Sequence, residues 1–557
     1  MKILHNKNRT IITSFILVIT SLIFILSFLS LSSCRSAEHD NIVSGSGIAA
    51  VNINLLGAEY ANDKPAQIAS IGQNGLIVDK NSQRYSVLVT PSSFISAELT
   101  TNTSLNTVAS TSNNLNTKAA VSGDQLGTEM KFRAIAYRQS DGSYQTHQDY
   151  TIGQSAQPMM LDSGKTYDII VYSYGVNTLP EISKGEMTNL SQAKIKYDDN
   201  NRDLMYQKIS GFIPDGNNHN NKLDIKLRHK LNQITVIIST NEFSINRIPL
   251  AKLGSHFSDG TFSLSNGIMA YSDISLDENL TFRSQSFPAS KIISDPIFIN
   301  ANTENTKTGH LDAYVEINGY LKTLNLPNSF KITPENKSTL TINLRKCWAY
   351  VFGSKREFMC HNLGADTSAD PFVAVSYIHG NKYQFGASNF ESGRFVSQYH
   401  DQLTDWKPET GWITSNIDYA SHKNDWNSGD EINPIKAGND PCPGGYRIPT
   451  AIEWHSLIYS NSLVYLGTWE TSVTNYYTGL KVGDDLYLPA AGYRTREEGW
   501  LKWRGSAGLY HSSHAIAYNA GDLSPELLYF ERGKTEMQSL DGWEGVNGFP
   551  IRCIKIE

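Results

Sequence analysis

Residues 165–174 read Lys-Thr-Tyr-Asp-Ile-Ile-Val-Tyr-Ser-Tyr and follow a Ser-Gly turn. β-Branched and aromatic residues stand on both faces of this segment, which predicts a central β-strand covered on both sides. Alternating apolar and polar residues indicate further strands before and after it, at 51–55, 130–137, 223–227, 234–238 and 340–344. No part of residues 46–345 keeps a helical period, so we expect antiparallel β structure, in two sandwiches in series.

Composition agrees with an exported β-rich protein. The 557 residues are 18% charged and 10% aromatic, and they include 28 tyrosines and 41 glycines. This length predicts three or four domains. The net charge is −6 and no basic stripe with interleaved aromatic residues occurs, so nucleic acid is not an expected partner.

The strand order resembles one known family. The strand at 165–174 is followed by Asp203-Leu204-Met205-Tyr206, and then by Leu-Arg-His-Lys-Leu-Asn-Gln-Ile-Thr-Val at 227–236. This pattern is similar to the Mfa-like branch of the fimbrillins, which are Bacteroidetes lipoproteins, and it covers about residues 46–345. The resemblance implies two transthyretin-like β-sandwiches and a role in surface filaments. We interpret His229 as a structural strand residue, since no second metal-type ligand has matching spacing.

In the C-terminal part of the chain, a helix is predicted directly after a rigid turn. Residues 440–454 read Asp-Pro-Cys-Pro-Gly-Gly-Tyr-Arg-Ile-Pro-Thr-Ala-Ile-Glu-Trp. The Pro/Gly-rich part predicts a turn, and Thr450 with Glu453 forms a capping-box pattern at a helix start. Trp454, Leu457 and Ile458 follow at i, i+3 and i+4, which predicts one apolar stripe on a short helix.

Further motifs complete a second resemblance. They are Phe-Met-Cys-His-Asn-Leu-Gly at 358–364, Leu-Tyr-Leu-Pro-Ala-Ala-Gly-Tyr-Arg at 486–494 and Gly-Phe-Pro-Ile-Arg-Cys-Ile at 548–554. With the 440–454 segment they resemble the Fibrobacter succinogenes major paralogous (FISUMP) domain, over about 200 residues. The helix and the closing Arg-Cys strand also resemble C-type-lectin and formylglycine-generating-enzyme folds, which implies a compact α+β domain. That likeness implies a disulfide between Cys442 and Cys553, and Cys347 would then pair with Cys360.

The resemblance to enzymes does not extend to catalytic residues. Formylglycine-generating enzymes use a cysteine pair where this chain has His511-Ser512-Ser513-His514, and no lipase-type serine motif or phosphate-binding loop occurs. We therefore predict no enzyme, no cofactor and no metal, and we interpret His511 and His514 as exposed loop histidines.

The resemblance to C-type lectins raises the question of ligand binding by the C-terminal domain. The calcium-binding motifs of C-type lectins are absent, with Trp426-Asn427 on the wrong side of the helix. A surface of aromatic residues can still bind a glycan or a protein by stacking. The candidates are Trp500, Trp503, Tyr510, His511 and Trp543, with core packing as the other interpretation of each.

The N-terminus predicts export and lipidation. A basic start, a long apolar run and Leu31-Ser32-Ser33-Cys34 resemble a bacterial lipoprotein signal, in which Cys34 carries the lipid; an uncleaved membrane anchor is the alternative. The expected organisation is a signal at 1–34, a tether at 35–45, β-sandwiches at 46–222 and 223–346, and a FISUMP/C-type-lectin-like domain at 347–557.

The fimbrillin resemblance also implies a mode of assembly. Subunits of that family lose an N-terminal strand after an arginine or a lysine, and accept a strand from the next subunit. Arg84 and Lys80 are the candidate positions. The last residues here match the closing strand of the C-terminal domain, so we expect a tip or accessory subunit at the outer-membrane surface. The alternative is an anchored lipoprotein that never polymerises and binds polysaccharide or host protein.

Overall fold

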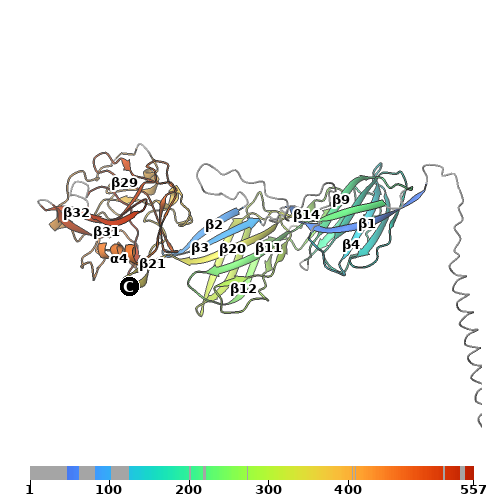
Figure 1. The fold of residues 1–557 in the computed structure, drawn as a ribbon, viewed down its shortest axis with the longest axis horizontal. Coiled ribbons are helices and arrows are strands. Elements are labelled where there is room, and N and C mark those ends of the chain that lie inside the picture. The colour runs from blue at the N-terminus through green and yellow to red at the C-terminus, as the bar shows by residue number, and fades with distance from the viewer. Residues whose placement is uncertain are drawn as a thin grey trace, which may run out of the picture.

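The computed structural model describes residues 47–61, 82–101, 124–199, 202–217, 221–272, 274–403, 406–407, 409–518, 521–539 and 546–557. These residues form three lobes in a row, two of them built from β-sheets and the third from residues 347–557, here called the C-terminal domain (Figure 1). The fold is mainly β, as predicted. Among the described helices, none has both the length and the apolar character needed to cross a membrane. Cys34, Lys80 and Trp543 lie outside the described residues.

The first β-domain is built on one seven-stranded sheet. Its strands, in spatial order, are β5 (Tyr144–Thr151), β4 (Lys131–Arg138), β7 (Tyr167–Ser173), β9 (Met205–Phe212), β10 (Asn221–His229), β1 (Ile48–Glu59) and β6 (Met159–Asp162). The sheet curls until β5 and β6, its two ends, contact each other. Every residue of β7 is buried, as its two-faced sequence predicts.

Both faces of this sheet are packed. Val51, Phe132, Ile169 and Ile225 belong to the core on one face. On the other face, Tyr172 packs into a second core formed with a three-stranded sheet. That sheet has the order β14 (Met269–Tyr271), β13 (Asp259–Ser263) and β8 (Lys194–Asp198).

The second β-domain has two sheets around one core. The first sheet has the order β16 (Lys291–Ile293), β11 (Asn232–Thr240), β20 (Lys337–Lys346), β3 (Ser93–Thr101) and β2 (Ser82–Thr90), with β17 (Ile297–Ile299) also paired to β11. The second sheet has the order β15 (Leu276–Asn279), β12 (Ile245–His256), β18 (Gly309–Ile317) and β19 (Tyr320–Phe330).

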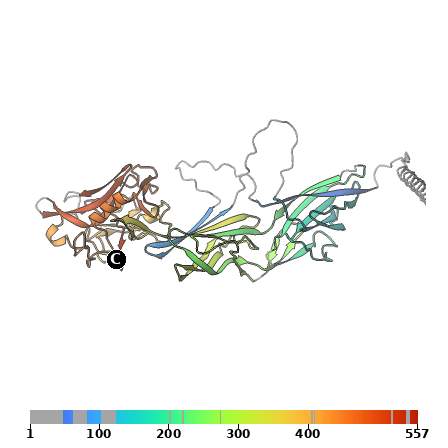
Figure 2. The ribbon, with the colours of Figure 1, turned by 60° about the horizontal axis from the view of Figure 1, so that its bottom comes forward.

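Strand pairing departs from the expected pattern in two respects. Each β-domain contains one parallel pair, β1 with β10 and β11 with β20, whereas we expected antiparallel strands throughout. The sheets also do not divide at residue 222, because β10 completes the first domain while β2 and β3 join the second. The chain therefore passes from the first domain to the second, returns for β4 to β10, and passes forward again (Figure 2). After β11 and β12 it returns once more for β13 and β14, which form a sheet with β8. The alternation of residue types determines which face of a strand is buried, but not which strand it pairs with. The crossings of the chain between the two domains were therefore not predictable from the sequence.

The C-terminal domain is α+β with many short strands. Its elements are β21 (Trp348–Val351), β22 (Ser354–Glu357), η2 (Ser376–Ile378), β23 (Lys382–Tyr383), β24 (Phe395–Val396), α2 (Gln398–Asp401), α3 (Tyr419–His422), β25 (Tyr446–Arg447), α4 (Ala451–Ser460), β26 (Leu463–Leu466), β27 (Gly479–Val482), β28 (Leu486–Pro489), β29 (Tyr493–Arg494), β30 (Leu501–Lys502), β31 (Ala507–Tyr518), β32 (Asp522–Glu531), β33 (Lys534–Ser539) and β34 (Ile554–Lys555).

Helix α4 begins as the sequence predicts. The Thr450 side chain accepts from the Glu453 backbone N–H, and the Glu453 carboxylate accepts from the Thr450 N–H, which completes the capping box. Arg447 holds the same carboxylate with two hydrogen bonds of 2.6 and 2.7 Å. Trp454 is fully buried in the domain core, and its indole N–H donates to the His511 carbonyl.

Candidate assembly strand and ligand surfaces

Strand β1 fills a slot between two strands of its sheet. It pairs antiparallel with β6 along Ile48–Val51 and in parallel with β10 along Val51–Glu59, so each of its edges is hydrogen-bonded over part of the strand. Val51 and Ile53 point into the domain core, while Asn52 between them is exposed. Burial of two such side chains contributes about 1.5–3 kcal/mol each. Without β1, the sheet would present two unpaired edges and an apolar floor, which is what an added strand needs.

Ion pairs fasten the far end of β1. Glu59 accepts from Arg228 and lies 3.2 Å from the Lys226 ammonium, and both cations come from β10. Burial raises the pKa of Glu59 but these two cations outweigh it, so its pKa is lowered. A bulge separates this end from the regular part of the strand, at Gly57, whose φ of 118° suits glycine. Beyond Glu59, Tyr60 stacks on His229 at 3.9 Å.

His229 is a structural residue, in line with its sequence interpretation. Its ring is buried, and Nδ1 lies 2.7 Å from the Asp203 carboxylate.

Arg84 lies within strand β2, at the outer edge of the second β-domain. Its side chain is 58% exposed and contacts Glu98 of β3 at 3.1 Å. A cut after Arg84 would therefore break a strand that is paired along its length with β3. Of the two candidate processing positions, this is the one that the structure describes, and it is accessible at the side chain but held at the backbone.

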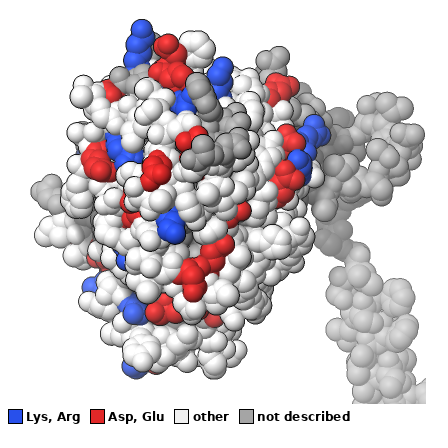
Figure 3. Space-filling model, turned by 90° about the vertical axis from the view of Figure 1, so that its left-hand side faces the viewer, with Lys and Arg blue, Asp and Glu red and all other residues white. Residues whose placement is uncertain are grey.

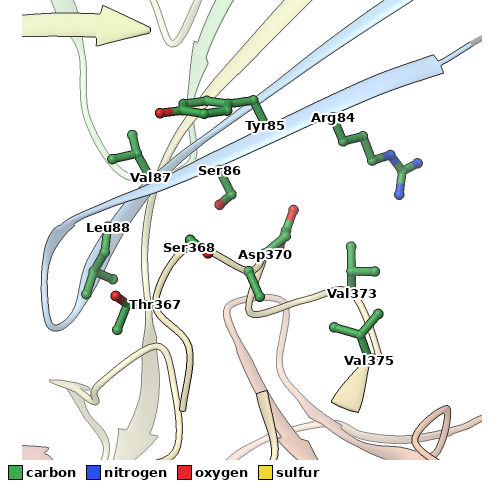
Figure 4. A pocket seen from close by; sticks show the side chains of 11 residues that line it. Arg84, Tyr85, Ser86, Val87, Leu88, Thr367, Ser368, Asp370, Val373 and Val375 are labelled. Carbon is green, nitrogen blue, oxygen red and sulfur yellow. The ribbon is translucent and has the colours of Figure 1, made fainter. Parts of the chain in front are cut away.

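A groove runs along the outer edge of β2. One part of it, about 590 Å³ in volume, is lined by residues 84–88 of β2 and by a loop of the C-terminal domain that includes Asp370 and Val375 (Figure 4). A second part of about 770 Å³ shares Arg84 and Val373 with the first and continues beneath residues 466–477. The groove therefore lies where the second β-domain meets the C-terminal domain.

The joint between these two domains is tied by covalent and polar contacts. Cys347, directly after β20, forms a disulfide with Cys360. The Cys360 N–H donates to the Pro91 carbonyl at 2.7 Å, and the Cys347 N–H donates to the Ser92 carbonyl at 2.8 Å. The turn between β2 and β3 is thereby bound to the start of the C-terminal domain.

The second disulfide holds the last strand of the C-terminal domain. Cys442 is bonded to Cys553, and Ile554 beside it pairs with Arg447 of β25. These are the two cysteine pairs that the fold resemblance implies.

Arg552 is also buried and has no carboxylate partner among its described contacts. It donates to the Asn362 side chain and to the carbonyls of Met359 and Cys360. Burial lowers the pKa of Arg552 to about 10.

Two of the predicted ligand residues are in the core. Tyr510 and His511 are fully buried on β31, so neither is a surface residue, and His511 is not an exposed loop histidine. The His511 ring packs edge-on against Trp426 and Phe549, and its Nε2 lies 2.8 Å from the Tyr383 carbonyl. Burial lowers the pKa of His511 to about 3, so the ring is neutral at physiological pH. The residues of β31 do not alternate between apolar and polar types, so the sequence did not reveal this burial.

The other two described candidates are at the surface. Trp500 is 59% exposed at the turn between β29 and β30, and Trp503 is 42% exposed after β30. Lys502 lies between them in sequence, with its ammonium 5.3 Å from the Trp500 ring centre. The end face of the C-terminal domain carries scattered acidic and basic residues on a mostly uncharged surface (Figure 3). Such a surface suits recognition by stacking and hydrogen bonds more than by charge.

A buried ionic cluster lies beneath this surface. Asp401 accepts hydrogen bonds from Lys382, Arg494 and Arg504, and all four side chains are at most 1% exposed. The spare N–H groups of the arginines donate to backbone carbonyls of residues 401, 403, 473 and 499. The cluster therefore fixes the loops around Trp500 and Trp503. No short-range sequence pattern predicts this ionic cluster, because its members are far apart in the chain.

Comparisons with known proteins leave the chain without a matching family model and without a matching curated protein. Several solved structures are similar to part of it. A Bacteroides uniformis protein to which cell adhesion is attributed is 13% identical, over 40% of this chain and 88% of its own, with a TM-score of 0.28. The tip fimbrial protein Mfa3 of Porphyromonas gingivalis is 9% identical, over 39% and 92%, with a TM-score of 0.26. A fimbrial assembly protein of Parabacteroides distasonis is 9% identical, over 42% and 87%, with a TM-score of 0.26. Each of these three matches covers most of the solved protein's length but less than half of this chain.

Proposed function

We propose that this chain is a lipid-anchored cell-surface protein that serves as the tip or accessory subunit of a fimbrium, with the C-terminal domain as its adhesive part. The observation that carries the proposal is the slot of β1. This strand pairs with β6 along residues 48–51 and with β10 along residues 51–59, and it has an apolar face in the core; residues 62–81 separate it from β2. Loss of β1 by proteolysis would open a site for one strand of a neighbouring subunit.

The tip position is supported by the strand at the other end of the described chain. A donor strand must be free of its own domain, but β34 pairs with β25 and follows a cysteine that is bonded to Cys442. Its first residue, Ile554, is fully buried. This strand is therefore built into the C-terminal domain, and the chain accepts a strand without donating this one.

The adhesive role is proposed for the face that carries Trp500 and Trp503. Exposed aromatic side chains on a framework held by a buried ionic cluster supply contact area without much loss of conformational entropy. The partner class is a glycan or a protein of a host or bacterial surface.

Immunogold electron microscopy on native cells, with an antibody to residues 347–557, tests the proposal. We expect label at the ends of thin filaments, and mature protein that lacks β1 by N-terminal sequencing. Label over the cell body on protein that retains β1 would instead favour a lipoprotein that does not polymerise and holds polysaccharide or host protein at the surface.

A further inference from the structure

A histidine in strand β31 faces two carboxylates from different parts of the C-terminal domain. His514 Nδ1 lies 2.7 Å from the Glu526 carboxylate on β32, and 3.4 Å from the Glu431 carboxylate in the loop before α4. One ligand atom of each residue lies within 4.8 Å of the other two. We propose that these three residues form a binding site for a divalent first-row transition metal ion such as Zn²⁺.

A β-bulge sets the position of the histidine. The register runs from the pair His511–Leu527 to the pair Ala515–Pro525, so Ser512, Ser513 and His514 together oppose Glu526. Extra residues in a bulge re-aim side chains, and bulges are frequent beside functional sites. Here the bulge turns His514 and Ser513 toward the same hollow.

The balance of charge favours a cation. If His514 is protonated, one imidazolium faces two carboxylates, and its single Nδ1–H cannot satisfy both oxygens. A divalent ion on neutral Nδ1 would neutralise the two carboxylates and contact all three groups. The nitrogen ligand favours a transition metal over calcium, which prefers oxygen ligands alone.

A buried hydroxyl beside the histidine supports a ligand independently. Ser513 is 2% exposed, and its Oγ is a buried atom without a hydrogen-bond partner among the described residues. Buried polar atoms are normally paired, by protein or by an ordered ligand. Ser513 and His514 both line a hollow of about 490 Å³, which also contains Glu431.

The supports of the site are already in place. The second oxygen of Glu431 accepts from the backbone N–H of Ile452 in the first turn of α4, at 3.0 Å. Lys423 is the basic side chain that lines the hollow, and its ammonium lies over the Tyr419 ring, 5.3 Å from the centre. The contact between Glu431 and the Ile452 N–H is of the kind that orients metal ligands and raises affinity.

Two other groups of similar composition do not qualify. His256 Nδ1 accepts from the Asn300 N–H, so its proton stays on Nε2, the atom that faces Asp199 and Glu278. His310 already has an oxygen partner at each ring nitrogen, the Thr308 carbonyl at 3.0 Å and the Asp277 carboxylate at 2.9 Å.

Isothermal titration of Zn²⁺ into the untagged protein that begins at residue 35 tests the proposal. We expect one ion per chain and no displacement by millimolar Ca²⁺. H514A should abolish binding, and S513A should weaken it about tenfold, as for other outer-shell groups. The control E536Q removes a carboxylate on β33 that contacts Lys534 and Gln538, and it should bind as the parent does.

Circular dichroism decides whether each variant is folded. If H514A is unfolded, the titration of E526Q takes its place, because glutamine keeps the shape of the side chain and removes its charge. Absence of Zn²⁺ binding by the parent, or equal binding by the parent and the folded variants, would overturn the site.

Discussion

The Lys382 ammonium lies 2.9 Å from Asp401 Oδ2, and both side chains are completely buried in the C-terminal domain. Asp401 also accepts from Arg494 and Arg504, so three cations share one carboxylate. These cations outweigh the opposing effect of burial and hold the pKa of Asp401 well below its usual range. Burial lowers the pKa of Lys382 to about 8.

We predict that D401N destabilises the C-terminal domain by about 3–5 kcal/mol, because it leaves buried charges without their partner. Urea denaturation followed by tryptophan fluorescence measures this, since all nine tryptophans lie in residues 347–557. The matched control is D484N, which removes an exposed aspartate paired with Lys481 and should leave the free energy of unfolding nearly unchanged. Equal losses for the two variants would contradict the structural importance of the cluster.

The two disulfides should differ in their contribution to stability. Cys442–Cys553 closes 111 residues and Cys347–Cys360 closes 13. In the chain-entropy model, replacing each pair by alanines lowers the free energy of unfolding by about 5 and about 3 kcal/mol, respectively. The same urea titration measures both. A larger loss for the short loop would show that the domain joint at Ser92, and not chain entropy, governs the effect.

Acid should destabilise the C-terminal domain through its buried histidines. Burial lowers the pKa of His511 to about 3 and that of His361 to about 4, against 6.5 for a free side chain. The unfolded chain therefore binds more protons below pH 6.5, so stability falls as the pH falls from 6.5 toward these values. For His511 alone, the loss between pH 7 and pH 5 is about 2 kcal/mol.

The variant H511F isolates this contribution. It loses the contact with the Tyr383 carbonyl at every pH, but its unfolding free energy should depend less on pH, by about 2 kcal/mol between pH 7 and pH 5. An unchanged pH dependence would mean that His511 is not the neutral core residue described above.

The stability of the pairing between β1 and its sheet can be measured in solution. We predict that β1 stays bound after a cut at an engineered protease site placed within residues 62–81, because it pairs with β6 at its start and with β10 along the rest of its length. V51D should release the cut segment, since it puts a charge into the apolar core, whereas N52D on the exposed side of the same strand should not. Size-exclusion chromatography with mass spectrometry detects release; loss of β1 from both variants alike would argue against a specific slot.

The sequence predicted local structure well wherever neighbouring residues carry the signal. The α4 capping box, the buried stripe of Trp454 and the two-faced strand β7 all follow from short-range patterns. Partners far apart in the chain were not predictable in this way. Lys382 and Arg494 meet at Asp401 only through the fold, and nothing in the sequence near His511 distinguishes a core histidine from a surface one.

The paths of β1 to β3 between the two β-domains also bear on how the protein is made. Leu99 of β3 pairs with Leu340 of β20, and Val51 of β1 pairs with Asn221 of β10. The ribosome delivers the first member of each pair long before the second. Pairing between such distant segments is slow and leaves strand edges exposed in the meantime. We therefore expect this protein to depend on a chaperone while it folds.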